Sequence, residues 1–258
     1  MKKSLPYIIV GIVAYLIFTV STVPASRVYV LMKEKYPLPL QLFSISGSIW
    51  HGRAAQAVIG PQTFESVTWS WRPFALFRGR LEYAVSMLYG QQPLSLNAGM
   101  AMDGSIELSD VTAQLDMSLL ERTVNPDPLG LTGTVAVDLS AVRLQAGRVQ
   151  LVEGELSWQN GGIGAPMNVS LGSYQASFVT DHDTIHGKIS DTGGPVILDA
   201  RLDMQPGGQY QLVASLSARD RSDQQVRKAL GFLGTPSPEG KVTLRRTGRL
   251  TVPVLTGR

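Results

Sequence analysis

The chain has 258 residues and a net charge of +3, with 44% hydrophobic and 17% charged residues. This low charge, with 26 glycines and 15 prolines, is typical of many short strands joined by turns and excludes a disordered chain. Lysine and arginine form no run that resembles a nucleic-acid patch, so no nucleic-acid surface is predicted. The lack of cysteine excludes a structural disulfide, a thiol nucleophile and a cysteine-based zinc site.

An uncharged run of 19 residues, 5–23, follows Lys2 and Lys3. About 20 apolar residues span a bilayer core as a helix, so the run predicts a transmembrane segment. The two lysines favour a cytoplasmic N-terminus at 1–4 and an exported remainder. A cleaved signal peptide is the alternative, since small residues follow the run, but signal apolar regions are usually only ~7 to 15 residues long. We expect a bacterial inner-membrane anchor that carries a periplasmic domain.

The rest of the chain divides into a juxtamembrane segment at 24–40 and a β-domain at 41–258. A short helix is predicted at 28–36, stopped by Pro37. The β-domain alternates apolar and polar residues, which indicates strands with one apolar face. This face must be buried in a closed barrel, a sandwich or a curved sheet, and alternation leaves the three open. The clearest alternating runs are 45–49, 67–71, 81–87, 111–117, 131–139 and 156–158.

Two local patterns near the C-terminus are the most distinct. Residues 196–204 and 210–218 predict a hairpin, because the intervening Gln-Pro-Gly-Gly supplies turn geometry. Residues 222–234 have helical spacing, with Ser222 or Asp223 as N-cap, Gly234 as C-cap and Val226, Leu230 and Leu233 on one face. A soft subdivision is predicted at 125–130, where two prolines and a glycine interrupt the alternation.

The stretch SISGSIWHG, residues 44–52, places Ser48 and His51 three residues apart between two glycines, a spacing that suggests a hydrolase nucleophile and base. A serine nucleophile elbow needs a G-x-S-x-G frame, which is absent here. The alternation instead predicts a strand with Ser48 and Trp50 on one face and His51 on the other, ending in a turn at Gly52. We therefore expect no catalytic role for this pair.

A second candidate is DHDTIHG, residues 181–187, in which His182 and His186 lie between aspartates. The H-E-x-x-H zinc pattern is absent, so a polar turn between strands is the favoured interpretation and no metal is expected. GGIG at 161–164 lacks the lysine and the helix of a phosphate site, and it is predicted to be a turn.

Aromatic residues concentrate between positions 50 and 77. Because large aromatic side chains bury the most area, a core cluster is favoured, and a partner-facing or lipid-facing surface is the alternative. The members are Trp50, Phe64, Trp69, Trp71, Phe74 and Phe77.

Five motifs, in a shared order behind the anchor, carry a family resemblance. They are SGSIWHGRA (46–54), VTWSWRPFALFRGRL (67–81), VEGELSWQN (152–160), GGPVILDARLDMQPGGQYQLVASLSAR (193–219) and ALGFLGTPSPEGKVTLRRTGRL (229–250). With them the chain resembles the type II secretion system protein N family, also called general secretion pathway protein N. The resemblance implies a bitopic inner-membrane protein whose periplasmic part is AsmA-like, with an antiparallel sheet curled into an apolar gutter. The expected fold is thus mainly β, with a long curved antiparallel sheet and one short C-terminal amphipathic helix.

The resemblance also implies a role in exporting folded proteins from the periplasm across the outer membrane. Expected partners are other inner-membrane subunits of the secretion platform and, through 5–23, the inner membrane itself. No enzyme and no cofactor are expected, because the family brings no established catalytic residues. Motif positions are interpreted as fold determinants, with glycines for turns or close approach and tryptophans for the sheet interior. These positions are Gly47, Trp50, Gly52, Trp69, Trp71, Pro73, Gly154, Trp158, Leu233, Gly234 and Gly240.

Two other functions are weighed against this one. In the first, an AsmA-like lipid-handling protein holds lipid acyl chains in its apolar gutter. In the second, Ser48 and His51 belong to an enzyme that acts on envelope material. The secretion role ranks first because a single anchor precedes an exported β-domain that is poor in catalytic groups.

Overall fold

The computed structural model describes residues 15, 18–19, 21–35, 40–60, 62–124, 130–165 and 168–249. The N-terminus predicted at 1–4 and most of the membrane segment predicted at 5–23 lie outside these residues. No helix in the described part of the chain is long and apolar enough to cross a membrane.

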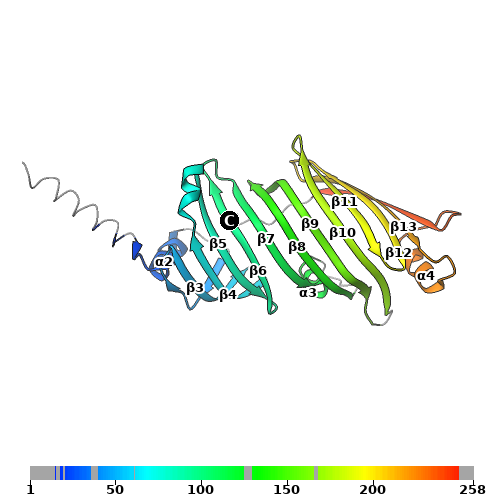
Figure 1. The fold of residues 1–258 in the computed structure, drawn as a ribbon, viewed down its shortest axis with the longest axis horizontal. Helices are drawn as coiled ribbons and strands as arrows, with labels where there is room; N and C mark the ends of the chain where they lie inside the picture. The colour runs from blue at the N-terminus through cyan, green and yellow to red at the C-terminus, as the bar shows by residue number, and fades with distance from the viewer. Residues whose placement is uncertain are drawn as a thin grey trace, which may run out of the picture.

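The strands form one 14-stranded antiparallel sheet that is open, with β1 at one edge and β14 at the other. From β3 to β14 each strand pairs with the next one in the chain, and β2 pairs with β3. Figure 1 shows one broad, twisted and curved layer. The strands are β1 (Leu40–Phe43), β2 (Ser46–Gly47), β3 (His51–Ile59), β4 (Gln62–Trp71), β5 (Arg80–Tyr89), β6 (Gln92–Ala101), β7 (Ile106–Asp116), β8 (Leu131–Gln145), β9 (Arg148–Ile163), β10 (Val169–Asp181), β11 (Thr184–Gly193), β12 (Val196–Met204), β13 (Gln209–Ala218) and β14 (Lys241–Arg249).

The register places the apolar side chains on one face of the sheet. A single cross-strand row runs from β5 to β14 with apolar residues only: Met87, Leu94, Ala113, Val137, Leu156, Ala176, Ile189, Ala200, Ala214 and Leu244. The neighbouring row on the other face contains Ser86, Ser95, Thr112, Asp138, Glu155, Ser177, Lys188 and Arg201. Period-two alternation therefore produced the two faces as expected, and of the three architectures the open curved sheet is the one observed.

Helical segments lie at the ends and edges of the sheet (Figure 1). They are α2 (Ala25–Lys35), the 3₁₀-helix η1 (Pro73–Arg78), α3 (Met117–Val124) and α4 (Gln224–Leu233). The helix predicted at 28–36, which corresponds to α2, and the C-terminal helix were expected, whereas η1 and α3 were not. Alternation through Met117 suggested that the strand continued, but the strand ends at Asp116.

The apolar face is packed in three separate clusters rather than one core. The first joins α4 to β12 and β14 around Val196 and Val242. The second lies on β3 and β4 around Ala54 and Val67, and the third lies around Ile185. Between these clusters many apolar side chains of the middle strands are only half-buried.

Two local predictions have different outcomes. The hairpin of β12 and β13 is confirmed in its full register, from Val196 opposite Ala218 to Met204 opposite Tyr210. The turn predicted at 161–164 is wrong, because Gly161 to Ile163 belong to β9. Glycine fits there because a Cβ at Gly161 would lie 2.9 Å from the carbonyl oxygen of Gly172 on β10. Residues 125–129 lie outside the described part, and β7 and β8 on either side of them pair along their length.

Candidate functional site

Helix α4 covers the apolar face at the β12–β14 end of the sheet. The Asp223 carboxylate accepts hydrogen bonds from two backbone N–H groups of the first turn, at 3.0 and 3.1 Å, which confirms it as the N-cap. Val226 and Leu230 are buried against Val196 and Val242. The helix is therefore fixed both by its cap and by the sheet beneath it.

Three predicted fold determinants lie at the C-terminal end of α4. Leu233 is 48% exposed, so its expected place on the buried face is wrong. Gly234 follows the helix in an extended conformation, and a Cβ there would lie 3.0 Å from a Val242 methyl carbon. Gly240 has φ 77° in the turn before β14, where its N–H donates to the Ser237 carbonyl at 2.8 Å. The two glycines thus permit close packing and a tight turn, respectively.

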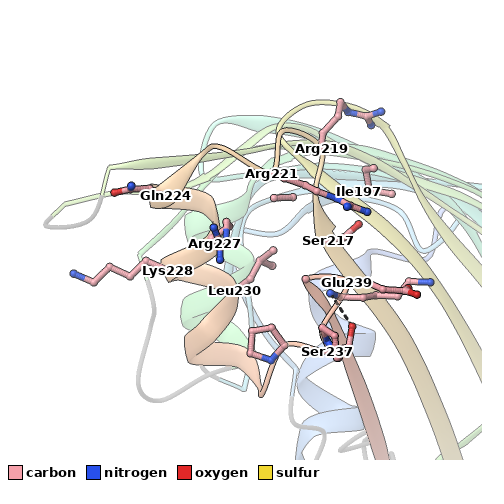
Figure 2. Close-up of a pocket in the computed structure, with 15 residues that line it drawn as sticks. Ile197, Ser217, Arg219, Arg221, Gln224, Arg227, Lys228, Leu230, Ser237 and Glu239 are labelled. Carbon is pink, nitrogen blue, oxygen red and sulfur yellow. Dashed lines mark hydrogen bonds between the residues drawn. The ribbon is translucent and has the colours of Figure 1, made fainter.

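A pocket of about 850 Å³ lies between α4, the ends of β12 and β13, and the turn before β14 (Figure 2). Figure 2 shows Leu230 directed toward the strands and Lys228 directed away from them. The Arg219 guanidinium is held by an ion pair with Asp191 and donates to the Gly194 carbonyl at 2.7 Å. The charged residues that line the pocket are Arg219, Arg221, Arg227, Lys228, Lys241 and Glu239.

The net charge of this pocket is positive. Within the described residues, Arg221, Arg227, Lys228 and Lys241 have no ion-pair partner. Outside the lining, Asp220 adds a negative charge, and its pKa is lowered by hydrogen bonds from the Ser222 hydroxyl and backbone N–H. Unpaired cations around a concave surface attract anionic groups.

Strand β14 forms one edge of the sheet beside this pocket. It pairs with β13 on one side, and no described strand pairs with it on the other. Its nine residues contain Lys241, Arg245, Arg246 and Arg249 and no acidic residue. Such an edge presents unpaired backbone groups to an added strand, and its cations discourage pairing with another basic strand. The pocket and the β14 edge together are called the α4–β14 site below.

The opposite edge of the sheet is occupied. The Tyr29 hydroxyl of α2 accepts a hydrogen bond from the Leu42 N–H at 2.9 Å and donates to the Leu40 carbonyl at 3.2 Å. These groups belong to β1, which is only four residues long. The long β14 edge is therefore the more accessible of the two.

The first chemical candidate, Ser48 with His51, lies in a tight turn between β2 and β3, so the predicted strand at 48–50 is wrong. The Ser48 N–H donates to the His51 carbonyl at 2.9 Å. The Ser48 hydroxyl accepts from the N–H groups of Trp50 and His51 at 3.3 and 3.1 Å. The serine and the histidine are thus close in space, but the hydroxyl is engaged by the turn.

Around this turn lie two predicted glycines. Gly47 has φ 89°, and a Cβ there would lie 2.5 Å from the His51 carbonyl oxygen. A Cβ at Gly52 would lie 2.3 Å from the indole ring of Trp69. Both positions therefore need the close approach that glycine allows.

The tryptophans and the proline of this region link the turn to η1. Trp69 packs on the Ala54–Val67 cluster. The rings of Trp50 and Trp71 lie 4.4 Å apart, and the backbone N–H of Trp71 donates to the backbone carbonyl of Trp50 at 2.6 Å. Pro73 then begins η1. The cluster interpretation holds for these tryptophans but is wrong for Phe74 and Phe77, which are 80% and 89% exposed.

Gly154 and Trp158 lie on β9. Gly154 has φ 130°, and a Cβ there would lie 2.4 Å from the Asp138 carbonyl oxygen on β8. The Trp158 indole N–H donates to the Thr132 carbonyl at 3.0 Å, and its ring lies 5.5 Å from that of Tyr174. These two residues therefore bring β8, β9 and β10 into close contact on the apolar face.

The second chemical candidate, residues 181–187, contains the predicted turn between strands, but only His182 and Asp183 form it, since Asp181 ends β10 and Thr184 begins β11. His182 and Asp183 adopt positive φ at its tip. Beyond the turn, His186 Nδ1 lies 2.7 Å from Asp203 Oδ1. Across the described residues there is no group of three or more side chains suited to hold a metal ion.

The α4–β14 site was not identified from the sequence. Its cations come from three segments, the end of β13, α4 and β14, and the packing of α4 on the sheet brings these segments together. The available signal was regional: between 219 and 249, basic residues outnumber acidic ones.

Comparisons with known proteins agree with the resemblance seen in the motifs. A model of the family described as "Type II secretion system (T2SS), protein N" matches residues 39–245. The Type II secretion system protein N of Aeromonas hydrophila is 24% identical over 97% of this chain and all of its own length. The protein of the same name from Vibrio cholerae serotype O1 is 24% identical over 83% of this chain and 87% of its own. No solved structure is significantly similar.

Proposed function

Given that the chain belongs to the type II secretion system protein N family, we propose that it is a non-enzymatic, single-span inner-membrane component of a secretion machine. In this role residues 5–23 cross the inner membrane, residues 1–4 are cytoplasmic and the β-domain is periplasmic. The protein supports export of folded proteins from the periplasm across the outer membrane by binding another subunit of the platform.

The membrane placement is supported by the sequence before the sheet. The run 5–23 is uncharged and of the length that a bilayer core requires, and Lys2 and Lys3 precede it. Because positively charged residues beside a membrane segment tend to stay in the cytoplasm, Lys2 and Lys3 favour a periplasmic sheet on the other side of the membrane.

The non-enzymatic role is supported by the state of the residues that first suggested chemistry. The Ser48 hydroxyl accepts two backbone N–H groups of its own turn. The His186 imidazole is occupied by Asp203. The Ser48 hydroxyl thus stabilises its own turn, and the His186 imidazole links β11 to Asp203 on β12.

Subunit binding is assigned to the α4–β14 site, and the observation that carries it is the unpaired basic edge of β14. An added strand would gain backbone hydrogen bonds along nine residues of β14. Acidic side chains on that strand would meet Arg245 and Arg246, and an acidic neighbour could enter the pocket beside Arg227 and Lys228. The partner is therefore an extended acidic segment of another platform subunit.

A secretion assay tests this proposal. Deleting the gene should reduce secretion of a dependent exoprotein, and the intact gene should restore it. The double variant Arg245→Glu/Arg246→Glu should fail to restore secretion and should lose its cross-link to the platform subunit, because reversed charges repel an acidic strand. Arg201→Glu is the matched control, since Arg201 shares the cross-strand row of Arg245 two strands away from the edge.

Two results would argue against the proposal. Unchanged secretion in the deletion strain under several growth conditions would remove the secretion role. If the Arg245→Glu/Arg246→Glu variant restored secretion in full and kept its cross-link to the platform subunit, the secretion role would stand, but the α4–β14 site would not be the binding site.

A second function, lipid handling, is favoured by one observation. The apolar row from β5 to β14 is continuous, and several of its members, Met87, Leu156 and Ile189 among them, are only half-buried. An apolar surface of this length suits acyl chains. Mass spectrometry of the purified full chain tests it: copurified phospholipid supports lipid handling, and a lipid-free protein with secretion activity contradicts it.

A further inference from the structure

One end of the sheet carries a group of exposed apolar side chains around η1, here called the η1 patch. Phe74, Phe77 and Met102 are 80%, 89% and 93% exposed. Soluble surfaces rarely expose several large apolar side chains together, so such groups mark contact surfaces. The patch consists of Phe74, Leu76, Phe77, Leu81, Met100 and Met102.

The fold holds these residues together. Pro73 begins η1, Gly79 ends it with φ 70°, and Ala75 is its one buried residue. The rest of η1 therefore points outward. On the following hairpin Leu81 lies opposite Met100 in the register of β5 and β6. The Met102 sulfur lies 4.0 Å from the place that a Cβ on Gly79 would occupy, so the turn after β6 joins η1.

The η1 patch lies at the end of the sheet where the apolar run 5–23 arrives. Val23, the last residue of that run, accepts a hydrogen bond from the Ile49 N–H at 3.1 Å. Pro24 forms a β-bridge with Ser48. The same turn contacts the end of β4, two residues before η1, through the rings of Trp50 and Trp71, which are 4.4 Å apart. A run long enough to span a bilayer thus ends at the turn that packs, through Trp50, against the residue Trp71 shortly before η1.

The charges around the patch fit an anionic lipid surface. Arg72 precedes η1 and Arg78 is its last residue; both are exposed, and Arg80 follows. Arg72 also pairs with Glu82, and Arg80 pairs with Glu107. Asp103 is the acidic residue of the adjoining turn, where it accepts hydrogen bonds from the Ser105 N–H and hydroxyl. Exposed aromatics with neighbouring arginines are typical of segments that lie in a membrane interface.

From these relationships we infer that the η1 patch inserts into the interfacial layer of the membrane that the protein is anchored in. The patch acts as a second contact beside the membrane-spanning run and fixes the tilt of the sheet, with this end against the lipid and α4 far from it. This inference rests on the proposed anchoring of residues 5–23. It commits to lipid as the occupant because the chain itself delivers the patch to the bilayer.

Lipid-depth fluorescence tests the inference on the full chain. The natural protein lacks cysteine, so Met102→Cys allows a single environment-sensitive fluorophore. The labelled chain is reconstituted in vesicles of phosphatidylethanolamine and phosphatidylglycerol that carry a nitroxide lipid labelled near the headgroup. The matched control is Gln91→Cys, because Gln91 is exposed at the opposite end of β5 and β6.

The expected result is a blue-shifted emission at position 102 that the nitroxide lipid quenches for the most part, with little quenching at 91. Adding Phe74→Asp/Phe77→Asp to the Met102→Cys chain should abolish the quenching, whereas adding Gln91→Asp should leave it unchanged. Equal quenching at 102 and 91, in a chain that floats with the vesicles, would overturn the inference and leave the anchor intact.

Two further outcomes have distinct meanings. Failure of the full chain to float with vesicles would overturn the anchoring and this inference together. Protection of position 102 from a soluble quencher without any nitroxide quenching would identify a protein contact at the patch and would also overturn the inference.

Discussion

Trp69 and Ser48 are joined by a hydrogen bond of 3.3 Å from the indole N–H to the backbone carbonyl. The indole N–H of the nearby Trp71 is buried, and no hydrogen-bond partner for it exists among the described residues. Trp69 and Trp71, which lie two positions apart on the same face of β4, therefore differ in the hydrogen bonding of their indole N–H groups, and this difference can be compared.

We expect Trp69→Phe to lower the free energy of unfolding by about 1 kcal/mol more than Trp71→Phe does. Both changes remove similar ring volume, but only the first leaves a carbonyl without its donor. Urea unfolding of the two full-length variants in detergent measures the difference. Equal losses would mean that the Trp69 hydrogen bond has no net effect on stability.

Gly154→Ala should destabilise the protein by about 1–3 kcal/mol, because the new methyl would meet the Asp138 carbonyl at a positive φ. Gly207→Ala is the control, since nothing lies within 4 Å of a Cβ there. It should change stability by less than ~0.5 kcal/mol. Thermal unfolding compares the two, and a similar transition temperature for both would contradict the close approach of β8 and β9.

Asp223→Ala should cost about 0.5–2 kcal/mol, because two N–H groups at the start of α4 lose their acceptor. The loss should be local, so hydrogen exchange of α4 amides should speed up while β7–β10 amides keep their rates. Asp223→Asn retains a capping oxygen and should exchange like the unmodified chain. Accelerated exchange across the whole sheet would show instead that α4 and the sheet unfold as one unit.

Alkaline conditions should weaken the fold through Tyr174. Burial and, to a lesser degree, the charge of Asp191 raise the pKa of Tyr174 from 10.0 to about 12. The unfolded chain then releases this proton at lower pH than the folded chain, so the stability from the neutral phenol is complete below pH 10 and is lost as pH rises toward 12.

Tyr174→Phe provides the check on that pH dependence. The free energy of unfolding, measured with urea across this alkaline range, should fall more steeply with pH for the unmodified chain than for the variant. The phenol donates to the Leu171 carbonyl at 2.6 Å, so the variant should start from a lower stability near neutral pH. Parallel curves for the two proteins would show that Tyr174 does not cause the alkaline loss.

Much of the sheet could be predicted because period-two alternation is a local property. Val196 to Met204 and Tyr210 to Ala218 alternate cleanly around a turn of proline and glycine, and their register followed from that turn. Asp223 was likewise one of two N-cap candidates, with Ser222, that were predicted from their position before an apolar helical stripe. The choice of an open curved sheet came from the family resemblance, since alternation fits barrels and sandwiches equally well.

The errors arose where local pattern and tertiary context disagree. Ser48 to Trp50 keep the alternation of a strand but form a turn, because the Ser48 hydroxyl binds the backbone of the turn. Phe74 and Phe77 are aromatic, but η1 directs them away from the sheet. The basic α4–β14 site depends on how α4 packs against β13 and β14, and the excess of basic residues between 219 and 249 indicates the charge but not this packing.

The sequential order of the sheet has a consequence for how the protein is made. Each strand from β4 to β14 pairs with the strand that precedes it in the chain. Because the chain is made from its N-terminus, the partner of each of these strands is made first. The sheet can therefore grow one strand at a time as the chain is synthesised, without waiting for distant segments to return. β14 is the last strand added, and its outer edge is the growing end that a strand from another protein can extend.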